Sequence, residues 1–173
     1  MKRLILIGGP MGVGKTTVGR ALQNQLPNSV FLDGDWCWDA NPFTVTEETK
    51  AMVLENIRFL LGQFLRCSVY ETVIFCWVMH QQIIVDAILS GLELDGVQVR
   101  AVSLTAQPDE LRRRLEHDVA AGLRSPDVVE RGLAYLECYG GLGTWKLDTT
   151  SLTPAEAARI LEAQLTNQRK REK

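Results

Sequence analysis

Short runs rich in apolar and β-branched residues recur along the chain. They occupy residues 2–8, 30–32, 72–79, 97–104 and 144–149. Leu4 to Ile7 and Val73 to Met79 are continuously apolar, which is typical of strands that are buried on both faces of a parallel sheet. The pattern therefore predicts five strands.

Between these runs, apolar residues recur three and four positions apart, the spacing of a helix with one buried face. Such segments occupy residues 15–26, 46–65 and 81–92, and others begin at Pro108 and Pro154. Thr46 and Thr153 are residue types that cap helix N-termini, and Glu156 completes a capping box with Thr153. Strands and helices thus alternate along 173 residues, which predicts one α/β domain.

The clearest chemical signal follows the first predicted strand. Residues 9–16, hereafter the phosphate loop, have glycine, four free positions and then Gly-Lys-Thr. Glycines let backbone N–H groups close on phosphate oxygens, and the helix that follows points its positive end at the same place. We expect Lys15 to reach the outer phosphates and the Thr16 hydroxyl to ligate Mg²⁺. The predicted nucleotide-binding set is Gly9, Gly12, Val13, Gly14, Lys15, Thr16 and Thr17.

A pair of acids follows the second predicted strand. Asp33, Gly34 and Asp35, hereafter the acidic turn, come at its carboxyl end. Ligands bind beyond the carboxyl ends of strands in open α/β sheets, so we expect both acids on the rim that carries the phosphate loop. Asp33 is the first choice for Mg²⁺ or the acceptor hydroxyl, and Asp35 for acceptor binding. The division between them stays open.

Residues near this rim are candidates for contact with an acceptor molecule. Trp36 is a candidate for stacking on a flat acceptor or for filling the core, and His80 for an acceptor contact or a helix cap. Arg58 is a candidate for binding an anionic group or for an ordinary surface position. The third strand lacks the usual terminal aspartate and continues into Trp77 and His80, so any aspartate for magnesium must be Asp33.

Residues 117–132, the predicted lid, contain two interruptions of regular structure, Gly122 and Pro126. Arg124 and Arg131 lie in or next to this break. An arginine there can close over phosphates, exclude water and stabilise charge during transfer. The alternative is an exposed turn with surface arginines. We assign Arg124 to the catalytic and nucleotide-binding sets.

Composition narrows the class further. The net charge of -2 argues against non-specific nucleic-acid or anionic-membrane binding, and no apolar stretch is long enough to span a bilayer. The four cysteines show no Cys-x-x-Cys pair, which argues against structural zinc and favours free thiols in a reducing cytoplasm. Both a monomer and a homodimer remain open.

The order of motifs resembles the small P-loop kinases of the shikimate, gluconate and adenylate kinase group. The resemblance is carried by the phosphate loop, the acidic turn, residues 104–106 before an arginine-bearing helix, Arg124, and residues 147–154. It implies a three-layer α/β/α fold with a five-stranded parallel sheet in the order 2-3-1-4-5. It also implies ATP and Mg²⁺ as cofactors, residues 149–154 bordering adenine, and transfer of the γ-phosphate to a small-molecule hydroxyl.

The acceptor itself stays open at this point. The middle segments hold only Arg58 and Arg66, whereas nucleotide kinases use more arginines around a second phosphate, so a neutral or aromatic acceptor is favoured. A nucleoside or nucleotide kinase is the alternative within the class. An ATP-binding switch protein with weak hydrolysis is the alternative outside it.

Overall fold

The computed structural model describes residues 2–167, without the side chains of 165–167. Its centre is an all-parallel sheet of five strands in the order β2-β3-β1-β4-β5, as predicted. The strands are β1 (Lys2–Gly8), β2 (Ser29–Asp33), β3 (Thr72–Cys76), β4 (Val97–Thr105) and β5 (Trp145–Asp148). β1 lies in the middle because its run of apolar side chains is fully enclosed, and this puts the phosphate loop at the centre of the rim.

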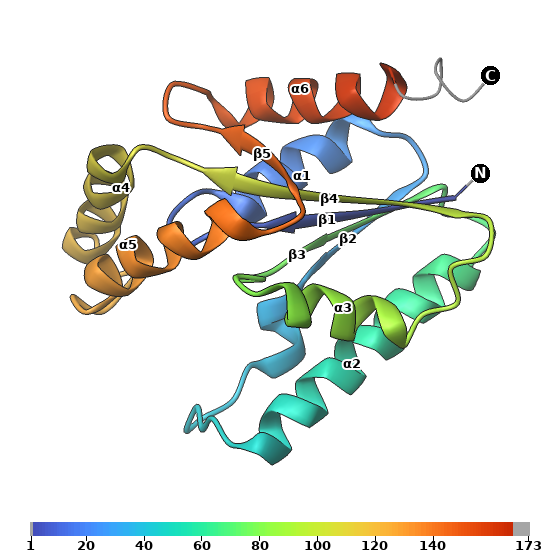
Figure 1. Cartoon of the computed structure of the whole chain (residues 1–173), viewed down its shortest axis with the longest axis horizontal. Coiled ribbons are helices and arrows are strands. Elements are labelled where there is room, and N and C mark those ends of the chain that lie inside the picture. The colour runs from blue at the N-terminus through green and yellow to red at the C-terminus, as the bar shows by residue number, and fades with distance from the viewer. Residues whose placement is uncertain (1, 168–173) are drawn as a thin grey trace.

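Helices cover both faces of the sheet, which gives the expected three layers (Figure 1). The α-helices are α1 (Lys15–Gln25), α2 (Glu47–Arg66), α3 (Gln82–Ser90), α4 (Pro108–Ala120), α5 (Val128–Cys138) and α6 (Pro154–Asn167). α1 and α6 pack on one face, and α2 and α3 on the other. α4 and α5 lie beyond the carboxyl ends of the strands, where the phosphate loop also lies (Figure 1).

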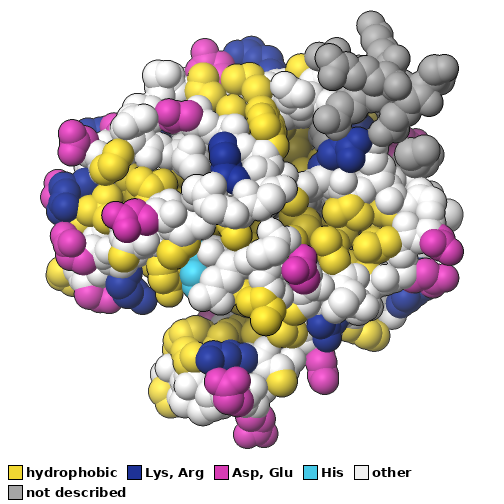
Figure 2. Space-filling model, in the orientation of Figure 1, with side chains coloured by type: hydrophobic (Ala, Val, Ile, Leu, Met, Phe, Trp, Pro, Cys, Tyr) yellow, Lys and Arg dark blue, Asp and Glu magenta, His cyan; other side chains and the backbone are white. Residues whose placement is uncertain are grey.

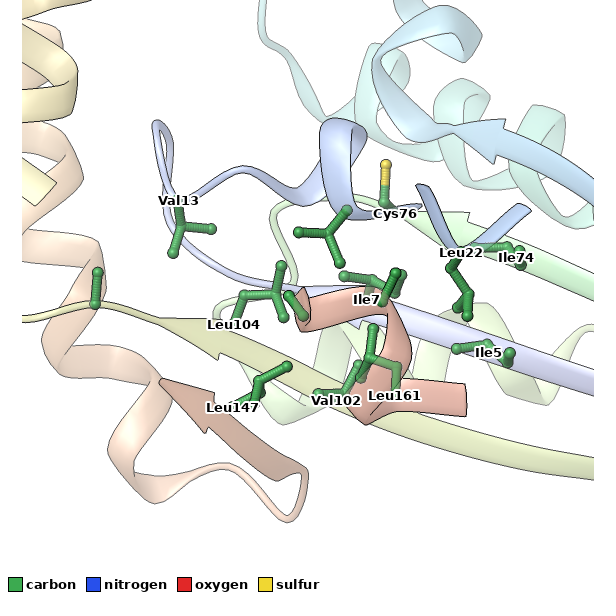
Figure 3. Close-up of a cluster of buried hydrophobic side chains, with 14 of the residues drawn as sticks. Ile5, Ile7, Val13, Leu22, Ile74, Cys76, Val102, Leu104, Leu147 and Leu161 are labelled. Atoms are coloured by element: carbon green, nitrogen blue, oxygen red, sulfur yellow. The ribbon is translucent and has the colours of Figure 1, made fainter. Parts of the chain in front are cut away.

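The core beneath α1 and α6 anchors the strands that carry the site. Ile5 and Ile7 of β1 meet Leu22 of α1 and Leu161 of α6, and Val102 of β4 packs beside them (Figure 3). Each of these side chains is at most 5% exposed. Full burial of one such side chain contributes about 1.5–3 kcal/mol, so this cluster holds the rim rigidly in place.

Helix starts follow the local sequence as predicted. The Thr46 side chain accepts from the N–H of Thr49 at the start of α2. Thr153 and Glu156 form the reciprocal bonds of a capping box at the start of α6.

The third strand differs from the prediction, because β3 ends at Cys76 and not at Met79. The N–H of Met79 donates to the carbonyl of Trp77 at 3.1 Å, and this tight turn takes Trp77 and Val78 out of the ladder and onto the rim. All these residues are apolar, so the hydrophobic pattern carries no mark of the turn.

The described residues also contain two short 3-10 helices. The first, η1 (Gly34–Trp38), begins within the acidic turn, where the Asp33 carboxylate accepts from the N–H of Asp35 at 3.1 Å. A second one, η2 (Tyr139–Gly141), follows α5.

All four cysteines are free, and no helix within residues 2–167 is long and apolar enough to cross a membrane.

Candidate active site

The phosphate loop is shaped by two glycines with different tasks. Gly12 has a φ of 77°, and a Cβ there would lie 2.4 Å from Leu115, so glycine lets α4 pack against the loop. Gly14 has a φ of 100° and starts α1, and no atom lies within 4 Å of the position of a Cβ. Its backbone is thus open to the cleft, as a phosphate site at a helix N-terminus requires.

Lys15 lies inside this loop. Its Nζ donates to the carbonyl of Pro10 at 2.9 Å. Burial lowers the pKa of Lys15 to about 8, although Cys76, Asp35 and Asp33 pull in the other direction. An incoming anion therefore finds a cation that has few competing partners and is poorly hydrated.

Thr16 and Asp33 meet across the gap between α1 and β2. The Thr16 hydroxyl donates to Asp33 Oδ2 at 2.6 Å, and Asp33 is only 6% exposed. A hydroxyl and a carboxylate at this distance fit Mg²⁺, which prefers oxygen ligands and completes its shell with phosphate oxygens and water. No cluster of three or more acidic, His or Cys side chains in the described part of the chain offers a fuller metal cage.

Asp35 is held by a residue that the sequence did not single out. The indole N–H of Trp77 donates to Asp35 Oδ1 at 3.1 Å. Burial and the Asp33 carboxylate raise the pKa of Asp35, whereas Lys15 and the Trp77 bond lower it. A Cβ on Gly34 would lie 2.5 Å from Trp77, so glycine in the acidic turn lets the indole reach the carboxylate.

These groups line one open cleft of about 390 Å³. Its floor is the phosphate loop, and the acidic turn and Val78 lie on one side. On the other side are polar and charged side chains of α4 and the predicted lid, namely Arg113, Arg114, His117, Asp118 and Arg124. Arg124 is held by Asp118, whose Oδ2 lies 3.0 Å from its Nε. The surface is hollowed between the body of the molecule and the lobe at the start of α2 (Figure 2).

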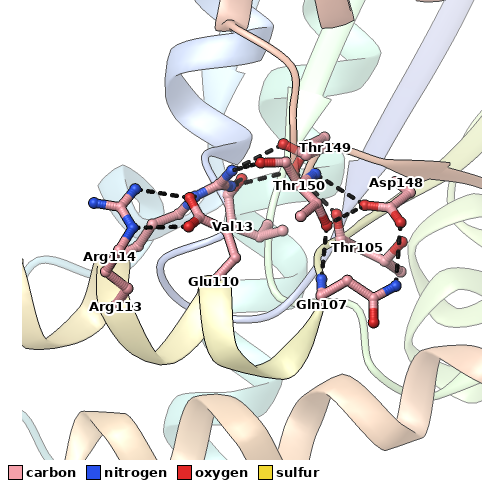
Figure 4. A network of polar contacts seen from close by, with 9 residues as sticks. All are labelled: Val13, Thr105, Gln107, Glu110, Arg113, Arg114, Asp148, Thr149 and Thr150. Carbon is pink, nitrogen blue, oxygen red and sulfur yellow. Dashed lines mark hydrogen bonds and ion pairs between the residues drawn. The ribbon is translucent and has the colours of Figure 1, made fainter.

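Arg114 joins three segments at the edge of the phosphate loop (Figure 4). It donates to the carbonyl of Val13 at 3.3 Å and to that of Thr149 at 2.8 Å, and Glu110 accepts from its Nε at 2.8 Å. Hydrogen bonds from Arg113 and Arg114 lower the pKa of Glu110 to about 2. A second hollow of about 450 Å³ adjoins this network and is bordered by residues 149–154.

A family profile described as an AAA domain matches residues 5–123, which is more than half of the chain. The chain belongs to this AAA domain family. A comparison with curated proteins found no match.

Solved structures similar to this AAA-family protein include a tunicamycin resistance protein and several kinases. The tunicamycin resistance protein of Deinococcus radiodurans is 23% identical with a TM-score of 0.68, covering 95% of this chain and 96% of that one. A gluconokinase from Sinorhizobium meliloti is 21% identical with a TM-score of 0.62, covering 95% of each chain. A shikimate kinase from Acinetobacter baumannii, in complex with shikimate, is 20% identical with a TM-score of 0.62, covering 96% and 94%. The predicted P-loop kinase fold is thereby confirmed.

Three predicted acceptor contacts of the AAA-family protein lie away from the cleft. Trp36 packs edge-on against Phe31, with Arg20 over both rings. The ring of His80 stacks on that of Tyr135, with the ring centroids 4.5 Å apart. Arg58 donates to the carbonyl of Ala87 and so caps the end of α3. Of the four candidates named from the sequence, only Asp35 lines the cleft.

Arg131, the second arginine of the predicted lid, also lies outside the cleft. Its Nε is 2.8 Å from Asp127, one turn earlier on α5. The structure therefore brings Arg124 to the phosphate loop and leaves Arg131 at the surface.

Sequence reasoning missed several cleft residues on α4. Arg113 and His117 are four positions apart, as are Arg114 and Asp118, and such pairs share one side of a helix. The four-residue spacing was the signal that would have found this face.

Proposed function

We propose that the protein is an ATP-dependent phosphotransferase that moves the γ-phosphate of ATP to a hydroxyl group of a small molecule. One observation carries the proposal: the acidic turn and the phosphate loop line the same cleft. A triphosphate on the loop and a hydroxyl on the acidic turn would then meet, which is the positioning that phosphoryl transfer needs.

The phosphate-binding side uses the open backbone at Gly14, the ammonium of Lys15 and the positive end of α1. Thr17 and Arg124 also line this part of the cleft. A triphosphate would compete with Pro10 for Lys15, and with Asp118 for Arg124. Both cations are thus already beside the place where charge develops.

Thr16 and Asp33 would hold Mg²⁺ through the two oxygens that now share a hydrogen bond. When bound, the ion neutralises charge on the phosphate oxygens. This gives Asp33 the metal role, because its Oδ2 is next to Thr16, and leaves Asp35 for the acceptor.

Asp35 would accept the proton of the acceptor hydroxyl. As the hydroxyl oxygen forms its bond to the γ-phosphorus, the bond from that phosphorus to the bridging oxygen of ADP breaks. The products are a phosphate ester, ADP and one proton. A raised pKa makes the Asp35 carboxylate a stronger base, and Trp77 keeps its oxygen directed.

The nucleoside would occupy the second hollow, beside residues 149–154 and Arg114. The resemblance to small kinases, which predicts adenine next to this segment, supports ATP as the donor. The hydrogen bonds from Arg114 to the carbonyls of Val13 and Thr149 would hold the nucleoside and phosphate parts of the site at a fixed distance from each other.

A metabolite extract tests the proposal without knowledge of the acceptor. The purified protein is incubated with ATP and Mg²⁺, and ADP release is measured with and without the extract. We expect the extract to accelerate ADP release, and Lys15→Ala to reduce it at least about 100-fold, as for the loss of a main charge-stabilising group. Slow hydrolysis that no extract accelerates would favour the ATP-binding switch instead.

A further inference from the structure

The two walls of the cleft differ in charge. Arg113, Arg114 and Arg124 lie on the wall made by α4 and the predicted lid, together with His117 and with Asp118, which pairs with Arg124. The facing wall carries Asp33, Asp35 and the apolar Val78. The indole of Trp77 adjoins this acidic wall through its bond to Asp35.

The segments behind the acidic wall, residues 34–66 and 77–90, are fully described and contain three lysine or arginine residues, Lys50, Arg58 and Arg66. Arg58 is bound to Ala87 and Ser90 at the end of α3. Lys50 pairs with Glu47, one turn earlier on α2, at 2.9 Å. Arg66 ends α2 and lines a separate hollow with Lys2, at the edge where β1 begins. None of these three side chains lines the cleft.

Arg20 of α1 is also engaged, with two aromatic rings. Arg20 lies 4.5 Å from the ring centroid of Phe31 and 5.0 Å from that of Trp36. Neither ring lines the cleft. The cations that do line the cleft lie on the phosphate loop, as Lys15 does, or on the opposite wall, and Lys15 and Arg124 act on the Asp35 carboxylate from there. Among the described residues, the acidic wall therefore has no cation of its own.

We propose that the acceptor is a hydroxyl compound without net negative charge, either uncharged or cationic. This inference rests on the proposed phosphotransferase function and adds the substrate class. An anionic acceptor on this wall would face the Asp35 carboxylate, and no cation of this wall would offset that repulsion. A neutral hydroxyl donates to Asp35 without that repulsion, and an ammonium group gains from its charge.

Charge fractionation of a metabolite extract tests the substrate class. Anion exchange at neutral pH separates neutral and cationic compounds, which pass through, from anionic compounds, which are retained. Each fraction is incubated with the protein and γ-labelled ATP, with Lys15→Ala as the blank. We expect Lys15-dependent transfer of label to be at least ten times faster with the unretained fraction.

The other outcomes separate the two proposals. Equal or faster transfer with the retained fraction would overturn the substrate class while leaving the phosphotransferase in place. Absence of transfer with either fraction would contradict the phosphotransferase itself, and with it this inference.

Arg58→Ala gives a second readout. We expect a lower melting temperature, because α3 loses its cap, and an acceptor KM within twofold of the unmodified protein. Lys50→Ala, which breaks only an exposed pair, is the matched control for both readouts. A tenfold or larger rise in acceptor KM in Arg58→Ala alone would put this arginine in the acceptor site and overturn the inference.

Discussion

The neighbours of Asp35 shift its pKa in opposite directions. Burial and Asp33 raise its pKa, and Lys15 and Trp77 lower it. The two acids were predictable because they follow a strand at a fixed rim. Trp77 was not, since an apolar run gives no sign that its last residues leave the sheet and turn a donor toward the rim.

Replacing Trp77 by Phe removes the donor and keeps an aromatic ring. We expect the pKa of Asp35 to rise further, because the indole hydrogen bond that stabilises the charged carboxylate is lost. Carbon-13 NMR titration of the Asp35 carboxyl measures this shift. Trp38→Phe is the control, since Trp38 packs on Phe43. An unchanged titration in Trp77→Phe would mean that the bond does not act on Asp35.

Lys15 gives a pH dependence to nucleotide binding. Its pKa in the free protein is about 8, and a bound triphosphate favours the ammonium, so binding takes up a proton above that pH. We expect ATP affinity to be constant below about pH 8 and to fall up to about tenfold per pH unit above it. Calorimetry in buffers of different ionisation enthalpy checks the proton uptake. In Lys15→Arg, which stays charged, we expect no such fall in ATP affinity above pH 8. The same pH dependence of ATP affinity in both proteins would show that Lys15 is not its source.

At the scale of elements, one arginine ties α4 to the phosphate loop and to the segment before α6. Helix boundaries and caps followed from local sequence, because N-caps and proline act within one turn. The hydrogen bonds of Arg114 could not be predicted from local sequence, since they join it to Val13 and Thr149, which are distant in the chain. The adjacent Arg112 instead forms an exposed pair with Glu130.

These neighbours provide a matched pair of variants. We expect Arg114→Ala to lower the free energy of unfolding by about 1–3 kcal/mol, because buried carbonyls lose a charged donor. Arg112→Ala should change it by less than about 0.5 kcal/mol, as an exposed ion pair. Chemical denaturation measures both. Equal effects of the two substitutions would show that the tie does not hold the elements together.

The two arginines of the predicted lid, Arg124 and Arg131, form a second matched pair of positions. Arg124 lines the cleft, and Arg131 pairs with Asp127 outside it. We expect Arg124→Ala to lower kcat about 100-fold, because it removes one positive group beside the transferred phosphate. We expect Arg131→Ala to keep the kcat of the unmodified protein. Equal loss in both would argue for a general effect on the connection between α4 and α5.

At the scale of the whole molecule, the sheet order puts β1, β2 and β3 side by side, and their carboxyl ends carry the phosphate loop, the acidic turn and Trp77. Hydrophobic patterning and the phosphate-loop motif were enough to predict this arrangement through the resemblance to small kinases. The difference in charge between the cleft walls was not predictable, because it depends on which charged side chains line the cleft and which lie outside it.

The most direct test compares Asp35→Asn with the unmodified protein for ATP affinity and for extract-dependent ADP release. The account predicts unchanged ATP affinity and a loss of release of about 10²–10⁴-fold, the usual contribution of a positioned base. Release at the unmodified rate would contradict the account, because it would show that the acid beside the phosphate loop takes no part in the reaction.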